Sequence, residues 1–184
     1  LITALLNPSI YPHEVQSVEL IQTHISYVLV AGDFVYKLKK PMNFGFLDFS
    51  TLPKRKYFCR EELRLNQRLC PTLYLDVLPI TKKNGNFDLG GRGKVVEYCV
   101  KMARMPENTM MTEIIAENRL TRQMLSGIVN ILVPFYQRAE GGDIIKEFGT
   151  AKAVSVNVFE NYEQIKSFIG CEAISAKKFD RIMT

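Results

Sequence analysis

The period of the apolar residues changes once along the chain, near residue 105, and this change most limits the folds that the chain can adopt. Before that point, β-branched and aromatic residues form short runs that alternate with polar residues, which is typical of strands. After Pro106 the apolar residues recur every three or four positions, which is typical of helices. The sequence therefore predicts an α+β protein in two parts, a β-rich part at residues 1–105 and a helical part at residues 106–184.

The β-rich part contains five predicted strands and one predicted helix. Ser50 is a typical N-cap residue and Pro53 a typical first-turn residue, so we expect a helix from here to about Cys70. Strand-like runs lie before and after this helix, at residues 18–22, 27–30, 34–40, 73–81 and 94–102. In the second part, helical patterns lie at residues 112–117, 121–139, 151–169 and 176–183. The first part therefore has the order of three strands, one helix and two strands.

The charge of the chain suits an anionic ligand without identifying one. Lys and Arg number 24 and Asp and Glu number 19, which gives a net charge of +5. A mild excess of this kind is usually spread over a solvated surface, although basic clusters can also bind nucleic acid. Neither an aromatic-rich RNA motif nor a DNA-reading module occurs in the sequence, so we predict no nucleic-acid partner.

The cysteines and the apolar runs indicate a soluble, cytoplasmic protein without a structural metal. The four cysteines have no CxxC spacing, and only two histidines accompany them, so free thiols in a reducing cytosol are expected. No apolar run approaches the ~18 to 20 residues that span a bilayer, and the start of the sequence lacks the pattern of a signal peptide. We therefore predict no membrane partner.

One carboxylate of the predicted helix faces inward and requires a cation. At about 100° per residue, Glu62 falls near the middle of an apolar arc, whereas Glu61 falls on its polar margin. The arc consists of Phe58, Cys59, Leu63, Leu65, Leu69 and Cys70. A buried carboxylate is costly unless a cation meets it. We predict that this cation is Lys37, on the strand face opposite Tyr36, with Lys39 on the same face as the alternative.

Such a pair has two interpretations. In a kinase, a strand lysine held by a helix glutamate is fixed against the α- and β-phosphates of ATP. In many other proteins, the same pair is only a salt bridge between a sheet and a helix. The sequence around Lys37 and Glu62 favours the kinase interpretation and leaves the structural one open.

Several short motifs resemble a known family. FVYK at residues 34–37 is similar to the V-A-I-K strand of protein kinases. QTHIS at 22–26, VYKLKKP at 35–41, GFLDFS at 45–50 and EELRLN at 61–66 resemble the bacterial aminoglycoside phosphotransferase family. They resemble in particular the branch in which a kinase-like part precedes a P-loop ATPase part. The resemblance covers about residues 4–140, and it implies a kinase-like N-lobe with a five-stranded antiparallel sheet and one helix, followed by the start of a helical C-lobe.

The resemblance also implies a ligand and a set of site residues. ATP and Mg²⁺ would be the cofactors of the full-length protein, and a hydroxyl group of a small molecule would be the acceptor. Lys37 would hold the phosphates and Glu62 would hold Lys37. The backbone from Ala103 to Met105 would bind the adenine. The turn from Thr23 to Ser26 lies where kinases have a glycine-rich loop, but it contains no glycine, so its hydroxyl groups would replace backbone donors.

The residues that would complete a phosphotransferase are missing from the sequence. No Asp has a His two residues before it and an Asn five residues after it, so neither the catalytic base nor the asparagine ligand of magnesium is present. Asp48 lies in a motif that only partly matches the metal-binding D-F-G, and Asp143 lies in one that only partly matches the His-Gly-Asp of the family. Our first hypothesis is that the chain is the ATP-binding portion of a phosphotransferase and is inactive by itself. The alternative is a nucleotide-sensing or scaffold domain that regulates an attached P-loop ATPase.

Overall fold

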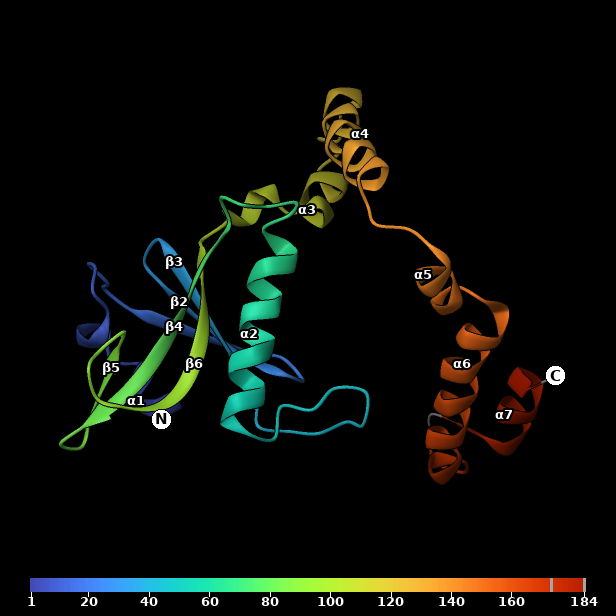
Figure 1. Ribbon diagram of the computed structural model, residues 1–184, viewed down its shortest axis with the longest axis horizontal. Helices are drawn as coiled ribbons and strands as arrows, with labels where there is room; N and C mark the ends of the chain where they lie inside the picture. Colours follow the sequence, from blue (N-terminus) through green and yellow to red (C-terminus); the bar gives the residue numbers. More distant parts are fainter. Residues whose placement is uncertain (173, 184) are drawn as a thin grey trace. The chain divides into compact units, whose positions relative to one another are not determined.

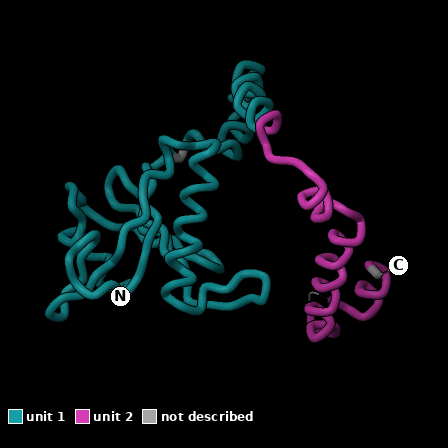
Figure 2. Tube along the Cα trace, viewed as in Figure 1, with its two compact units in different colours: residues 1–135 teal, residues 136–184 magenta. Residues whose placement is uncertain are grey.

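The computed structural model describes residues 1–172 and 174–183. Two compact units make up the chain, Leu1–Phe135 and Tyr136–Thr184 (Figure 2). The last strand ends at Ala103, close to the predicted change from strands to helices, and the end of the predicted helical part, Thr184, lies outside the described residues. Among the described residues, no helix is both long and apolar enough to cross a membrane.

The first unit is built on one antiparallel sheet (Figure 1). Its strands are β1 (Val18–Gln22), β2 (Ser26–Ala31), β3 (Phe34–Lys39), β4 (Tyr74–Lys83), β5 (Asn86–Leu89) and β6 (Lys94–Ala103). In space their order is β1-β2-β3-β6-β4-β5, and every neighbouring pair is antiparallel. The α+β class and the five predicted strands are confirmed. The predicted number of strands is wrong, because the sheet has six.

The additional strand, β5, follows a two-residue turn. Asn84 and Gly85 have φ angles of 51° and 86°, the positive values that a tight hairpin of this kind requires. Lys83 then pairs with Asn86, and β5 continues along β4 as far as Leu89. The Asn-Gly pair predicts this turn. The run after it was not recognised as a strand because it is only four residues long and ends at consecutive glycines.

Seven α-helices are described along the two units. They are α1 (Ile2–Leu5), α2 (Leu52–Asn66), α3 (Met111–Ala116), α4 (Arg122–Gln137), α5 (Asp143–Phe148), α6 (Ala151–Ile165) and α7 (Ala176–Met183). Three short 3₁₀ helices lie at Pro8–Ile10, Glu107–Thr109 and Lys166–Phe168. All the predicted helices are present. α2, α4 and α6 are shorter than predicted, α3 is shifted by one residue, α7 has the predicted bounds, and α1 and α5 were not predicted. In Figure 1, α2 lies along β4 and β6.

The N-terminus of α2 is capped by Thr51 and not by Ser50 as predicted. The Thr51 hydroxyl accepts a hydrogen bond from the N–H of Lys54 at 3.4 Å. The backbone N–H of Ser50 instead donates to Asp48 Oδ1 in the preceding turn. Both residue types are good caps, so the sequence alone did not decide between neighbours.

Replacing Thr51 with Ala therefore has a larger effect on stability than replacing Ser50 with Ala. Loss of a helix cap costs about 1 kcal/mol, and we expect Thr51→Ala to lower the free energy of unfolding by about this amount. Ser50→Ala removes a hydroxyl outside the cap, so it has little effect. Urea unfolding of the two variants tests the assignment, and the reverse order of stability contradicts it.

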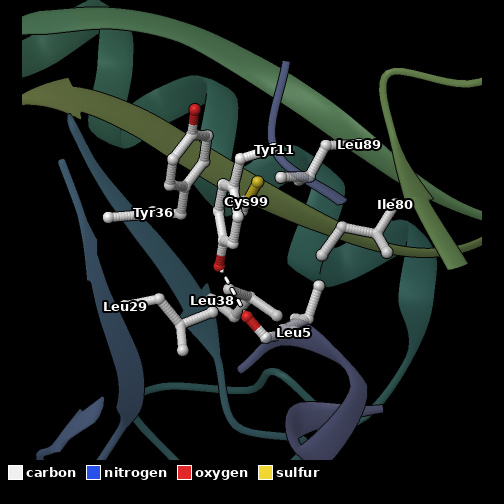
Figure 3. Packing of buried hydrophobic residues seen from close by; sticks show 9 residues of the cluster. Leu5, Tyr11, Leu29, Tyr36, Leu38, Ile80, Leu89 and Cys99 are labelled. Carbon is white, nitrogen blue, oxygen red and sulfur yellow. Dashed lines mark hydrogen bonds between the residues drawn. The ribbon is translucent and has the colours of Figure 1, made fainter. Parts of the chain in front are cut away.

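The hydrophobic core lies on one face of the sheet, beneath the N-terminal segment. Figure 3 shows Leu5 and Tyr11 from this segment packed against buried side chains of the strands, namely Leu29, Tyr36, Leu38, Ile80, Leu89 and Cys99. The Tyr11 hydroxyl donates to the carbonyl of Leu5 at 2.7 Å. Because side chains alternate along a strand, Lys37 and Lys39, which alternate with Tyr36 and Leu38, face the other side of the sheet. The core therefore leaves the second face of the sheet to Lys37 and its neighbours.

Candidate functional site

Two lysines of β3 meet one carboxylate of α2 on the second face of the sheet. Lys37 Nζ lies 2.7 Å from Glu62 Oε1, and Lys39 Nζ lies 2.7 Å from Glu62 Oε2. The predicted contact between Lys37 and Glu62 is confirmed. The two lysines were predicted as alternatives, and the structure brings both to the same glutamate, because residues two apart on a strand project to the same side.

The helix presents Glu62 and Glu61 to different surroundings, as its periodicity predicts. The Glu62 side chain is only 13% exposed, whereas Glu61 is paired at the surface with Arg64, 2.7 Å away. Of the predicted apolar arc, Cys59 is buried, but Leu65 is exposed and Cys70 lies beyond the end of α2. The helical wheel therefore predicted the inward side of α2 correctly, but it assigned too many residues to that side.

The charges around Glu62 keep it ionised. Burial acts to raise the pKa of Glu62, but hydrogen bonds and charges from Lys37 and Lys39 act against burial and prevail, so the pKa lies below its ordinary value. The three side chains therefore carry one negative and two positive charges. The cluster keeps a net charge of +1, which suits an anionic ligand.

Lys37 is the member of the cluster that a ligand can reach. Its side chain is 30% exposed, whereas that of Lys39 is 6% exposed. The ammonium group of Lys39 also lies 4.7 Å from the centre of the Phe49 ring, within the range of a cation–π contact. The difference in exposure makes Lys37, and not Lys39, the lysine of the cluster that is open to a ligand.

An apolar pocket lies on the same sheet face as Lys37. It has a volume of about 260 Å³, and most of its lining residues are apolar, with two charged residues beside them. The apolar residues are Ile21, Val28, Val30, Val35, Leu73, Met102, Ala103 and Met105, and the charged ones are Glu19 and Arg104. The strand register explains the placement, because Val28 is paired with Lys37 and Val35 is paired with Met102. Same-face positions along a strand are about 7 Å apart, so the backbone of Lys37 is one such step from that of Val35. Sequence analysis missed most of the lining residues, although the alternation of each strand could have identified them.

The last residue of β6, Ala103, and the two residues after it, Arg104 and Met105, are among those that line this pocket, and the adenine-binding role of Ala103 and Met105 stays a prediction. The N–H of Ala103 donates to the carbonyl of Leu73 at 2.9 Å, and the N–H of Arg104 donates to that of Asp33 at 2.8 Å. Within the described part of the chain, the N–H of Met105 has no hydrogen-bond partner. Met105 therefore combines a place in the pocket lining with a backbone donor that no described residue engages.

The predicted turn between β1 and β2 is present at residues 23–25, whereas Ser26, predicted as part of the turn, is the first residue of β2. The hydroxyl groups of Thr23 and Ser26 have different surroundings. The Thr23 hydroxyl accepts a hydrogen bond from the N–H of Ser26 at 3.0 Å, which closes the turn. Ser26 is fully buried beside Lys39, its partner in the register, and its hydroxyl has no hydrogen-bond partner among the described residues. The contribution of Thr23 and Ser26 to phosphate binding stays a prediction.

A buried ion pair that the sequence analysis missed fixes the other end of α2. Arg55 Nε donates to both carboxylate oxygens of Glu97 in β6 at 2.9 Å, and its Nη1 donates to the carbonyl of Phe49 at 3.0 Å. Arg55 lies seven residues before Glu62, so both point from the same side of the helix. This spacing could have indicated that Arg55 faces the sheet, although it does not identify Glu97 as the partner. The two contacts together fix α2 against β3 and β6.

No preformed cluster of metal ligands is found among the described residues. They contain no group of three or more His, Cys, Asp or Glu side chains that could hold a metal ion. Both oxygens of Glu62 are bound by lysines, and Asp48 is paired with Lys54. Magnesium ligands would have to come from residues other than these.

The comparisons with known proteins give distant relatives and no family. The chain is 28% identical over 149 residues to uncharacterized proteins of Mycobacterium bovis and of two strains of Mycobacterium tuberculosis. The match covers 81% of this chain and 28% of each relative, so the chain spans little more than a quarter of the length of these curated relatives. No family model matches the chain, and no solved structure matches it at a significant level.

Proposed function

We propose that the β-rich part of this chain binds ATP and serves as the nucleotide-binding portion of a small-molecule phosphotransferase. The observation that carries the proposal is the contact between Lys37 and Glu62 beside an apolar pocket on the same face of the sheet. The pocket would take the adenine, and the partly exposed ammonium group of Lys37 would meet the phosphates. The acceptor would be a hydroxyl group of a small molecule.

The topology supports a kinase-like lobe as the scaffold of this site. Three strands precede α2 and three follow it, in the spatial order β1-β2-β3-β6-β4-β5. Apart from the additional edge strand β5, this agrees with the strand, strand, strand, helix, strand, strand order that the motifs imply. The lysine is in the third strand and the glutamate in the helix, as in protein kinases. The segment at Met105 would then take the place of the hinge.

The residues of this chain would contribute by binding and orientation. Phosphoryl transfer depends mainly on positioning and on neutralisation of negative charge. Lys37 would supply a positive charge at a fixed place, because Glu62 restricts the ammonium group. The Met105 N–H would donate a hydrogen bond to the base. The catalytic base and the magnesium ligands would come from residues outside this sequence, and the ATP itself supplies the transferred group.

A titration of the 184-residue chain with a fluorescent ATP analogue tests the proposal. We expect saturable binding that unlabelled ATP and adenosine both reverse, because the pocket recognises the base and Lys37 recognises the phosphates. A single-stranded oligonucleotide is the control for non-specific attraction to the basic surface. Binding that is reversed equally well by the oligonucleotide, and that disappears with moderate salt, contradicts the proposal.

A further inference from the structure

A structural ion pair with Glu62 would require only one lysine, and the cluster contains a second one, Lys39. One ammonium group is sufficient to neutralise a buried carboxylate, and burial of a second ammonium group adds a desolvation cost. Nevertheless, Lys39 is almost completely buried and bound to the oxygen of Glu62 that Lys37 leaves free. The arrangement therefore provides Glu62 with one accessible and one inaccessible cation.

We propose that Lys39 is a positioning residue, whose buried ammonium group holds Glu62 in place while Lys37 turns toward the phosphates of a nucleotide. This inference rests on the proposed function. It assigns different roles to two lysines that are chemically identical and lie two residues apart. Lys37 binds the ligand, and Lys39 acts only through Glu62.

The geometry around Lys39 explains why it stays in place when a ligand binds. Its ammonium group is confined by Glu62 Oε2 at 2.7 Å and by the Phe49 ring at 4.7 Å. Phe49 is itself buried, and its carbonyl accepts a hydrogen bond from Arg55. Lys39 is thus held from two sides by groups that do not belong to the ligand pocket. Among the described residues, Glu62 is the ion-pair partner of Lys37, and the partly exposed ammonium group of Lys37 can share its charge with a phosphate.

The consequence of losing Lys39 follows from the surroundings of Glu62. Among the described residues, Lys37 and Lys39 face it from β3, and Tyr74 in β4 and Cys59 on α2 are further titratable groups that interact electrostatically with it. Of these groups, only the two lysines favour the charged carboxylate. With Lys39 absent and Lys37 drawn to a phosphate, burial would dominate. The pKa of Glu62 would then rise, and protonation would release Lys37.

The test compares nucleotide affinity as a function of pH in matched variants. The wild-type chain, Lys39→Met, Lys39→Arg and Lys40→Met are titrated with the fluorescent ATP analogue between pH 8 and pH 5. Lys40→Met removes the same charge from the neighbouring residue, whose ammonium group lies 4.9 Å from the centre of the Tyr27 ring. The ratio of each variant's affinity to that of the wild type cancels the protonation of the nucleotide itself.

We expect the affinity of Lys39→Met relative to the wild type to be lowest at pH 8 and to rise toward pH 5, because binding draws Lys37 away from Glu62, raises the pKa of Glu62 and so takes up a proton. Each unit by which binding raises this pKa can change the ratio by up to about tenfold. Lys39→Arg restores the cation and should give a ratio that does not change with pH. Lys40→Met should also give a constant ratio. A constant ratio for Lys39→Met overturns the assignment, because a merely structural role would weaken binding equally at every pH.

A second measurement separates this inference from the proposed function. The carboxyl carbon of Glu62 can be followed by ¹³C NMR in the chain without nucleotide, with Glu62→Gln used to assign the signal. In Lys39→Met we expect its titration to move to higher pH than in the wild type, and an unchanged titration overturns the role of Lys39. A wild-type chain that binds no nucleotide contradicts the proposed function, and the NMR titration still decides whether Lys39 keeps Glu62 ionised.

Discussion

Replacing Lys37 with Ala lowers the affinity of the chain for ATP by about 10- to 100-fold, the loss expected when a charge-assisted hydrogen bond to a phosphate is removed. The ammonium group of Lys37 is the accessible cation of the cluster, whereas Lys39 is buried. The variant should still fold, because Lys39 alone neutralises Glu62. Titration with the fluorescent ATP analogue measures the effect.

Adenosine distinguishes a specific phosphate contact from general damage to the site. Because adenosine has no phosphate, its affinity should be the same for the wild type and for Lys37→Ala. Lys54→Ala is the matched control for charge, since Lys54 pairs with Asp48 at the surface and away from the pocket. Equal losses of ATP affinity in Lys37→Ala and Lys54→Ala would point to non-specific attraction by the basic surface.

The second large effect is expected for Glu62→Gln, on stability as well as on binding. The substitution leaves two ammonium groups in contact with no anion, and one of them, Lys39, is buried. Removal of one partner from a buried ion pair costs about 3 to 5 kcal/mol. Since Glu62 retains some exposure, we expect a loss near the lower end of this range, measured by urea unfolding.

Glu61→Gln is the control for Glu62→Gln. Glu61 is paired with Arg64 at the surface, and exposed ion pairs of this kind contribute little, so stability and ATP affinity should hardly change. If Glu61→Gln had the larger effect, the assignment of the inward carboxylate would be wrong.

The stability contributed by Glu62 should also depend on pH. Because its pKa is lower in the folded chain than the ordinary value of 4.5, this contribution is fully present above pH 4.5 and is lost as the pH falls through the lower folded value. Glu62→Gln lacks a titrating group at this position. The difference in unfolding free energy between the wild type and Glu62→Gln should therefore shrink in acid, and a difference that is constant from pH 7 to pH 2 contradicts the pKa assignment.

The sequence predicted the contacts that depend on local periodicity. Alternation along residues 34–40 placed Lys37 on the face opposite Tyr36, and helical spacing placed Glu62 inward and Glu61 outward. Both placements are confirmed. Such patterns are set by the geometry of a single strand or a single helix, so no knowledge of the tertiary structure was needed.

The features that were missed depend on distant segments. The pocket requires the register between β1, β2, β3 and β6, which no local pattern contains. The Arg55 pair with Glu97 joins residues 42 positions apart. The simultaneous contact of Lys37 and Lys39 with Glu62 depends on the distance and angle between α2 and β3. Tertiary packing decides all three, and the sequence alone left them open.

NMR spectra of the chain during titration with a non-hydrolysable ATP analogue test the central claim most directly, because they locate the ligand on the sheet. We predict that the methyl signals of Val28, Val35 and Met102 and the amide signal of Met105 shift in a saturable way, while signals from the basic residues 54–56 stay in place. Shifts confined to residues 54–56, or no shifts at saturating nucleotide, would contradict the assignment of this sheet face as an ATP site.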